Sequence, residues 1–408
     1  MSAPAVPHVL AVQAGPPSQP QPSVLPCAGP TAQPAARPEK PKKRRIDAVD
    51  WLRGLAVVLM IQTHLYDAWC SPAAKTTVEY GWTRFWGGIP SRLFLLLVGV
   101  SMAIRYEHQI AAGADRRTIV RTAVRRGLEI LGLAYLFRLQ EYLLGGAYDW
   151  HDLFRVDILN CIGASMIVGA FITAPRNGRR PIALTALVAV VCIALGPIAG
   201  PHHFPDFLPR PLTSYLGGER PMSWFPLFPW LAWPLIGVLA GHAWVRGSGD
   251  ARRQAWTFVA TGAIGAALIL AVIWLRPVTH RHIHYPNWVV QQMGPEVFFH
   301  RLGIIGLMAL GGYVVTRLFG TRRFSLMRLF GQTSLLVYWV HVELCYGLLF
   351  RRLHHALSMR AATVALLLMI AAMAVVAKLR LRYWHGWRGR RPPTSTLRAN
   401  LPAAPSPL

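Results

Sequence analysis

Three ionisable residues flank an apolar run in the stretch DWLRGLAVVLMIQTH, residues 50–64. An α-helix turns by about 100° per residue, which puts Arg53 about 60° and His64 about 40° from Asp50 around the axis. The three residues therefore share one face, with Arg53 and His64 about 16 Å apart along the helix. A neutral imidazole can deprotonate a nucleophile or carry an acyl group, and a guanidinium can bind phosphate. The structural alternatives are an interfacial ion pair and an interfacial histidine.

Further polar residues lie at the edges of other apolar segments. Ionisable groups are costly in lipid, so we expect them to face the interior of a helix bundle, where convergent polar groups form a binding site. Arg138 and Glu141 are spaced i,i+3, which favours a salt bridge on one helix. Interfacial anchoring and helix capping are the alternatives for the others. The candidate binding residues at this level are Arg92, Arg155, Asp157, Asn160, His300 and Arg301.

A second polar face lies in GQTSLLVYWVHVELCYG, residues 331–347. Ser334, Tyr338 and His341 recur at i, i+4 and i+7, so they share one side of a helix. His341 is expected near the middle of the membrane, where it needs a partner. Both a polar cavity and hydrogen bonding between helices fit this pattern.

These residues must be positioned by membrane helices, because the chain is strongly apolar. It has 408 residues, of which 53% are hydrophobic, and its mean hydropathy is +0.34. Continuous apolar runs favour helices over a β-barrel. The predicted fold is an all-α polytopic integral membrane protein, a bundle of about ten transmembrane helices of roughly 20 residues each. The predicted spans are 51–67, 89–106, 125–144, 156–174, 181–199, 224–245, 255–275, 300–319, 329–350 and 361–379.

The basic residues are distributed unevenly between the connections. The formal net charge is +26, and the Lys and Arg side chains concentrate in alternate connections, as the positive-inside rule requires of cytoplasmic segments. This distribution places both termini in the cytoplasm and argues against a nucleic-acid partner. The segments predicted to be cytoplasmic are 37–45, 105–126, 176–180, 246–253, 317–328 and 378–398.

Composition divides the chain into three regions. Residues 1–45 form a Pro- and Ala-rich tail, expected to be disordered, that ends in the basic anchor KPKKRR. Residues 46–379 form one transmembrane domain, and residues 380–408 a basic, then Pro-rich, cytoplasmic tail. We predict no signal peptide and no soluble catalytic domain, so any chemistry belongs to the helix bundle. The five Cys lack metal-type spacing, and we expect no metal.

Five stretches, taken in order, are similar to a known family. RRIDAVDWLRGLAVVLMIQTH, FLLLVGVSMA, DILNCIG, FPLFPWLAWPLIGVLAG and GQTSLLVYWVH resemble the heparan-α-glucosaminide N-acetyltransferase-like family of multispan transmembrane sugar acyltransferases. The resemblance runs from about Arg45 to about His341. It implies transfer of an acetyl group from cytoplasmic acetyl-CoA to a sugar amine or hydroxyl on the outer side, with an essential histidine.

The resemblance also assigns roles to residues of this chain. His64 matches the histidine of bacterial relatives, and residues 65–91 contain no other histidine, so His64 is the expected catalytic base or acyl carrier, oriented by Asp67 or a neighbour. Asp50, Arg53 and His341 are the expected donor-side residues, and the six candidate binding residues form the acceptor side. The expected surroundings are the lipid bilayer of the inner cell membrane, acetyl-CoA as co-substrate, a saccharide acceptor and, left open, a homodimer. A transporter of a sugar or anionic solute and a non-catalytic scaffold are the alternative functions.

Overall fold

A computed structural model describes most of the chain, and all of its named elements are helices. The long helices are α1 (Asp47–Trp69), α4 (Pro90–Ala111), α5 (Arg116–Leu144), α6 (Ile158–Thr173), α7 (Ile182–Ala199), α10 (Ala232–Gly247), α11 (Ala251–His282), α13 (Pro295–Phe319), α14 (Leu326–Tyr346) and α15 (Met359–Gly389). The short ones are α2 (Pro72–Lys75), α3 (Val78–Gly87), α8 (Arg210–Leu216), α9 (Leu227–Trp230) and the 3₁₀ helices η1 (Trp150–Phe154) and η2 (Leu348–Leu353). The described residues are 46–144, 150–176, 179–199, 208–217, 223–282, 292–320 and 325–389. The predicted all-α class is confirmed within these ranges.

Each of the ten predicted spans overlaps one of the long helices. Six helical segments of the described chain are long and apolar enough to cross a membrane, so the protein is a multi-pass membrane protein: Val78–Ala111, Ile182–Ala199, Leu227–Gly247, Ala251–Thr279, Pro295–Phe319 and Met359–Tyr383. The helices α1, α5, α6 and α14 are not among these six, because they are shorter or carry more polar residues. Ten crossings and the orientation of the termini therefore stay predictions.

The last helix differs from its predicted extent. We expected the final span to end at residue 379, but α15 continues to Gly389. The residues beyond 379 include Leu381, Tyr383 and Trp384 between basic residues, and none of the types that end a helix occurs there before Gly386.

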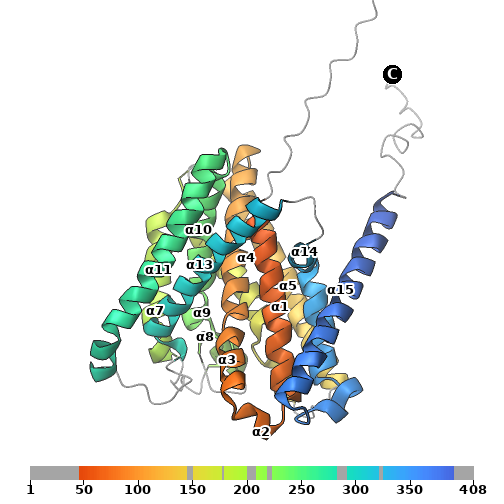
Figure 1. Cartoon of the computed structure of the whole chain (residues 1–408). Coiled ribbons are helices and arrows are strands. Elements are labelled where there is room, and N and C mark those ends of the chain that lie inside the picture. Colours follow the sequence, from red (N-terminus) through yellow and green to blue (C-terminus); the bar gives the residue numbers. More distant parts are fainter. Residues whose placement is uncertain are drawn as a thin grey trace, which may run out of the picture. The chain divides into compact units, whose positions relative to one another are not determined.

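Helix α1 lies at the centre of the fold and packs against α3, α4, α13, α14 and α15 (Figure 1). Two glycines let the backbones of α1 and α14 come close together. A Cβ at Gly54 would overlap the carbonyl group of Met327, and a Cβ at Gly331 would overlap that of Asp50. Small residues at a crossing are the usual means by which membrane helices approach each other.

Helix α14 bends immediately after this crossing. Thr333 has non-helical dihedral angles, φ −119° and ψ 17°. Beyond the bend, α14 follows α1, so that His341 lies beside His64 and Tyr346 lies beside Asp67. The bend therefore brings the polar face of α14 against that of α1.

Helices α4 and α10 pack as a second close pair, running in the same direction. Gly99 of α4 faces Pro234 of α10. Further along both helices, Glu107 of α4 accepts a hydrogen bond from the Nδ1–H of His242 of α10. Helix α4 runs opposite to α1, because Arg53 near the start of α1 contacts Ser101 in the second half of α4, while Thr63 near the end of α1 lies beside Gly87, just before α4. The start of α1 and the ends of α4 and α10 thus lie at one end of the bundle, and α2 and α3 lie at the other (Figure 1).

Candidate active site

A cavity of about 1780 Å³ lies between α1, α4, α5, α6, α13 and α14. It extends along the bundle, so side chains from both ends of these helices line it. We call one part the histidine end, which is lined by His64, Asp67, Arg92 and Arg301. We call the other part the basic end, which is lined by Arg53, Arg105, Arg126 and Arg380.

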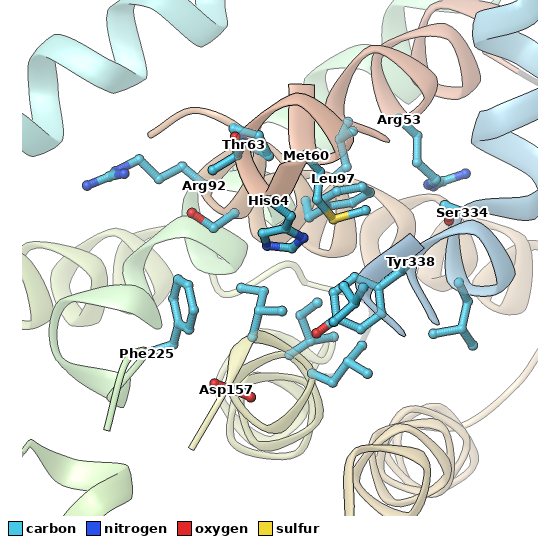
Figure 2. Close-up of a pocket in the computed structure, with 18 of the residues that line it drawn as sticks. Arg53, Met60, Thr63, His64, Arg92, Leu97, Asp157, Phe225, Ser334 and Tyr338 are labelled. Carbon is cyan, nitrogen blue, oxygen red and sulfur yellow. The ribbon is translucent and has the colours of Figure 1, made fainter. Parts of the chain in front are cut away.

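At the histidine end, His64 and His341 form a contacting pair. The His64 Nδ1 and His341 Nε2 atoms are 2.9 Å apart, and the two ring planes are almost parallel, at 8°, with their centroids 5.1 Å apart. His341 is completely buried, and its Nδ1 lies 2.6 Å from the carbonyl oxygen of Val337. Figure 2 shows the His64 ring pointing from α1 into the cavity, with Tyr338 and Asp157 on the facing helices.

This arrangement fixes which nitrogen of each ring carries the proton. The Val337 carbonyl can only accept a hydrogen bond, so His341 Nδ1–H is the donor. Among the described residues no carboxylate pairs with either ring, and an unpaired charge in an apolar bundle is strongly unfavourable, so both rings are neutral and His341 Nε2 is an acceptor. His64 Nδ1–H must then donate to it, which leaves the lone pair on His64 Nε2. His64 is therefore held in the tautomer that acts as a base through Nε2.

Asp67 contacts this pair indirectly. Its Oδ2 accepts a hydrogen bond of 2.9 Å from the Tyr346 hydroxyl, and the Tyr346 ring packs edge-on against His64 with centroids 5.7 Å apart. Direct orientation of His64 by Asp67 was expected, but the ring nitrogen of His64 bonds to His341 instead. His341 itself was assigned to the donor side, and it lies at the histidine end because of the bend in α14.

At the basic end, Arg53 is held in place by two neighbours. Its Nη1 donates to Asp50 Oδ1 at 3.1 Å, and its Nη2 donates to Ser101 Oγ at 3.0 Å. Asp50 does not itself line the cavity, so it positions Arg53. The other three arginines of the basic end belong to segments that the sequence predicts to be cytoplasmic.

Two further predicted residues, Arg92 and Arg301, line the histidine end and are almost completely buried. Arg92 donates to the Gly88 carbonyl, and Arg301 Nη1 donates to the Phe85 carbonyl at 2.7 Å. Arg92 lies on the opposite side of His64 from Arg53 (Figure 2). These two arginines therefore belong to a different part of the cavity from the basic end.

The polar residues of α5 and α6 form an ion-paired cluster at the cavity wall. Arg138 pairs with Glu141, as the i,i+3 spacing predicts, and also with Asp157 at the start of α6. Arg155 is 3.8 Å from Glu141, and both Arg155 and Asp157 line the cavity. Arg155 and Asp157 were predicted to bind the acceptor, but their charges are partly balanced by ion pairs within the protein.

The structure does not bring every predicted residue to the cavity. Asn160 is buried at the first turn of α6, where its Oδ1 accepts from the Asp157 N–H and its Nδ2 donates to the Tyr215 hydroxyl. His300 packs edge-on against Phe85 and does not line the cavity. Both residues were predicted to bind the acceptor. Each is adjacent in sequence to a residue that lines the cavity, Leu159 or Arg301, and successive residues of a helix point about 100° apart. No cluster of metal-ligating side chains occurs among the described residues.

Three residues of the site were not predicted from the sequence. Tyr346 and Ser101 hold predicted residues in place, and Trp230 lines the cavity beside Arg92. The signal for Trp230 was its position between Pro229 and Pro234, where a broken helix must face protein or a cavity. The partners of Tyr346 and Ser101 depend on the register between helices, which the sequence does not display.

The comparison with protein families agrees with this architecture. A family model described as heparan-alpha-glucosaminide N-acetyltransferase, catalytic, matches residues 45–277, which is more than half of the chain. The matched residues include His64 and Arg92, and they end before Arg301 and His341. A search of curated proteins finds no match. The chain therefore belongs to the catalytic-domain family of heparan-alpha-glucosaminide N-acetyltransferase, and is a membrane acyltransferase by that membership.

Proposed function

We propose that the protein transfers an acetyl group from cytoplasmic acetyl-CoA to a saccharide amine or hydroxyl on the outer side of the inner cell membrane. The observation that carries this proposal is that one cavity joins a group of arginines to a histidine whose Nε2 is available as a base. The two ends suit the two substrates, because a phosphate-rich donor needs cations and an acceptor needs a base at its nucleophile.

The basic end suits the phosphates of CoA. Arg53 is pre-positioned by Asp50 and Ser101, and guanidinium groups bind phosphate oxygens through paired N–H donors. With the phosphates at this end, the extended pantetheine arm lies along the cavity and carries the thioester toward His64. This placement agrees with the predicted cytoplasmic side of the basic end.

The chemical step follows from the tautomer of His64. His64 Nε2 takes a proton from the acceptor amine or hydroxyl as that nitrogen or oxygen attacks the acetyl carbonyl carbon. The C–S bond of the thioester then breaks, the acetyl group stays on the acceptor, and the CoA thiolate leaves with the proton from His64 Nε2, which restores the base. His341 stabilises the charged His64 ring only through its Nε2 lone pair, so it acts as a positioning residue.

The test uses full-length protein in nanodiscs with acetyl-labelled acetyl-CoA and a panel of neutral, amino and acidic sugars. We expect release of CoA that depends on the acceptor, and a loss of about 10²–10⁴-fold in kcat for His64→Ala. His108→Ala is the matched control, because His108 is an exposed histidine at the far end of α4. Its rate should equal that of the wild type.

Two results would contradict the proposal. One is a rate that His64→Ala does not change, since the base would then be another group. The other is uptake of a sugar or anionic solute into proteoliposomes without consumption of acetyl-CoA, which would make the protein a transporter. Acetyl label that remains on the wild-type protein, but not on His64→Ala, when the acceptor is omitted would instead show that His64 carries the acetyl group.

A further inference from the structure

Arg92 and Arg301 are two buried cations at the histidine end of the cavity. Their side chains are 6% and 9% exposed, and both line the cavity. In the part of the chain that the structure describes, neither forms an ion pair, whereas the buried Arg138 has two carboxylate partners. Among the described residues, each of the two guanidinium groups has one hydrogen bond, to a backbone carbonyl, out of the five N–H donors that arginine offers.

The two guanidinium groups are also close to each other. Atoms of both lie within 3.4 Å of the point where a Cβ at Gly88 would stand. Two cations this close repel each other, and burial increases the repulsion because the surroundings are less polarisable than water. Aromatic faces offset part of this cost, since Arg301 lies over Phe85 at 4.3 Å and Arg92 lies over Trp230 at 5.0 Å. A bound anion would remove the remainder.

Trp230 gives an independent sign of a ligand. Its side chain is 8% exposed and lines the cavity beside Arg92. Its indole Nε1–H is buried and has no hydrogen-bond acceptor among the described residues. Buried donors are almost always satisfied, so this N–H also points to an acceptor atom that is supplied from outside the protein.

We propose that Arg92, Arg301 and the Trp230 indole N–H form a binding site for an anionic group of the acceptor, either a carboxylate or a phosphate ester. This inference rests on the proposed function, which it deepens by making the acceptor an acidic saccharide. Two guanidinium groups and one N–H donor match the several oxygens of such a group. The anion is not that of the donor, because Arg92 lies across His64 from Arg53 and the basic end (Figure 2).

The first experiment measures anion binding without turnover. His64→Ala protein in nanodiscs is titrated with inorganic phosphate, glucuronate and methyl glucoside, and binding is followed by calorimetry and by the shift in melting temperature. We expect saturable binding of glucuronate or phosphate and none of the neutral sugar. The anion that binds with the lower dissociation constant identifies the group as a carboxylate or a phosphate ester.

Variants of the three residues test the assignment. Arg92→Gln and Arg301→Gln should each weaken anion binding by about tenfold or more, the value of one charge-assisted hydrogen bond. Trp230→Phe keeps the ring under Arg92 but loses the N–H, and should weaken binding by a smaller factor. Arg317→Gln is the matched control, because Arg317 is an exposed arginine on the same helix as Arg301, and it should bind like the parent.

Gly88→Ala provides a test that keeps both arginines. The added methyl group would contact both guanidinium ends, so it should weaken anion binding while the protein still folds. The inference is overturned if no anion binds, if the arginine variants bind as well as the Arg317→Gln control, or if CoA alone displaces the anion in competition. Anion binding by a wild-type protein that transfers acetyl to none of the acceptors tested would instead contradict only the proposed function.

Discussion

At the scale of single residues, the hydrogen bonds from Val337 through His341 to His64 decide which nitrogen is basic. His341→Phe removes the acceptor of the His64 Nδ1–H, so the His64 ring is no longer held in one tautomer. We expect kcat for acetyl transfer to fall by roughly 10- to 100-fold, less than the loss of the base itself. The Michaelis constant for acetyl-CoA should stay the same, because the basic end is untouched.

A conservative variant separates this positioning role from a structural one. The amide oxygen of His341→Gln can accept the same hydrogen bond, so it should restore part of kcat. His108→Phe makes the same replacement at an exposed position near the end of α4 and controls for the change of residue type. If Phe and Gln at position 341 reduce kcat equally while both proteins melt like the wild type, the hydrogen bond does not govern the base.

The sequence predicts individual residues at this scale better than their partners. Helical periodicity placed Arg53 and His64 on one face, and both line the cavity. It could not show that His341 would meet His64, because that contact depends on the rotation and shift of α14 against α1. The same limit explains why Asp67, three residues after His64 in sequence, is hydrogen-bonded to Tyr346 of α14.

At the scale of helices, the site depends on the close crossing of α1 and α14. A methyl group at Gly331 would meet the backbone of Asp50, which cannot move aside without shifting α1. Gly331→Ala should therefore separate the two histidines and reduce acetyl transfer and the melting temperature together. Gly311→Ala is the matched control, since a Cβ there meets nothing within 4 Å, and alanine favours a helix over glycine.

If Gly331→Ala changes neither acetyl transfer nor the melting temperature, the site does not depend on the close crossing of α1 and α14. The prediction is specific because both variants add the same methyl group to a helix, and only their surroundings differ. Activity and melting temperature of the two purified proteins in nanodiscs provide the comparison.

The start of α6 is held by the ion pair between Asp157 and Arg138. Arg138 is buried, with a side chain 5% exposed, so removing a carboxylate partner leaves its charge poorly compensated. We expect Asp157→Asn to lower the free energy of unfolding by roughly 2 kcal/mol, the size of a hydrogen bond to a charged group. Thermal unfolding in detergent measures the effect.

Asp152→Asn is the control for this pair. Asp152 is 3.9 Å from Arg155 and its side chain is 32% exposed, so its loss should change the unfolding free energy by less than about 1 kcal/mol. Equal melting temperatures for the two variants would contradict a structural role for Asp157. They would leave its carboxylate, which also lines the cavity, as a group for the acceptor.

At the scale of the whole molecule, the order of apolar segments predicts where the long helices lie, but not which of them cross the membrane. Helices α1, α5 and α14 line the cavity with polar residues, and those same residues lower the hydropathy that identifies a span. The residues that do the chemistry are thus the ones that weaken the membrane signal. For the same reason, the sequence alone does not decide how many helices cross the bilayer.

The two ends of the cavity must face opposite sides of the membrane if the donor and acceptor meet across it. Four native cysteines are buried, namely Cys70, Cys161, Cys192 and Cys345, so single cysteines can report sidedness once Cys27 is replaced by serine. Glu79→Cys marks α3 near the histidine end, and Arg252→Cys marks the start of α11 near the basic end. Both positions are exposed.

In intact cells, a membrane-impermeant maleimide should label Glu79→Cys at once and Arg252→Cys only after the membrane is permeabilised. The parent Cys27→Ser protein is the control for background labelling. The positive-inside rule gives this direction, because residues 246–253 carry three arginines that retain the basic end in the cytoplasm. Labelling of both positions from the same side would mean that the cavity does not join the two faces, and acetyl-CoA and acceptor would then have to enter from one compartment.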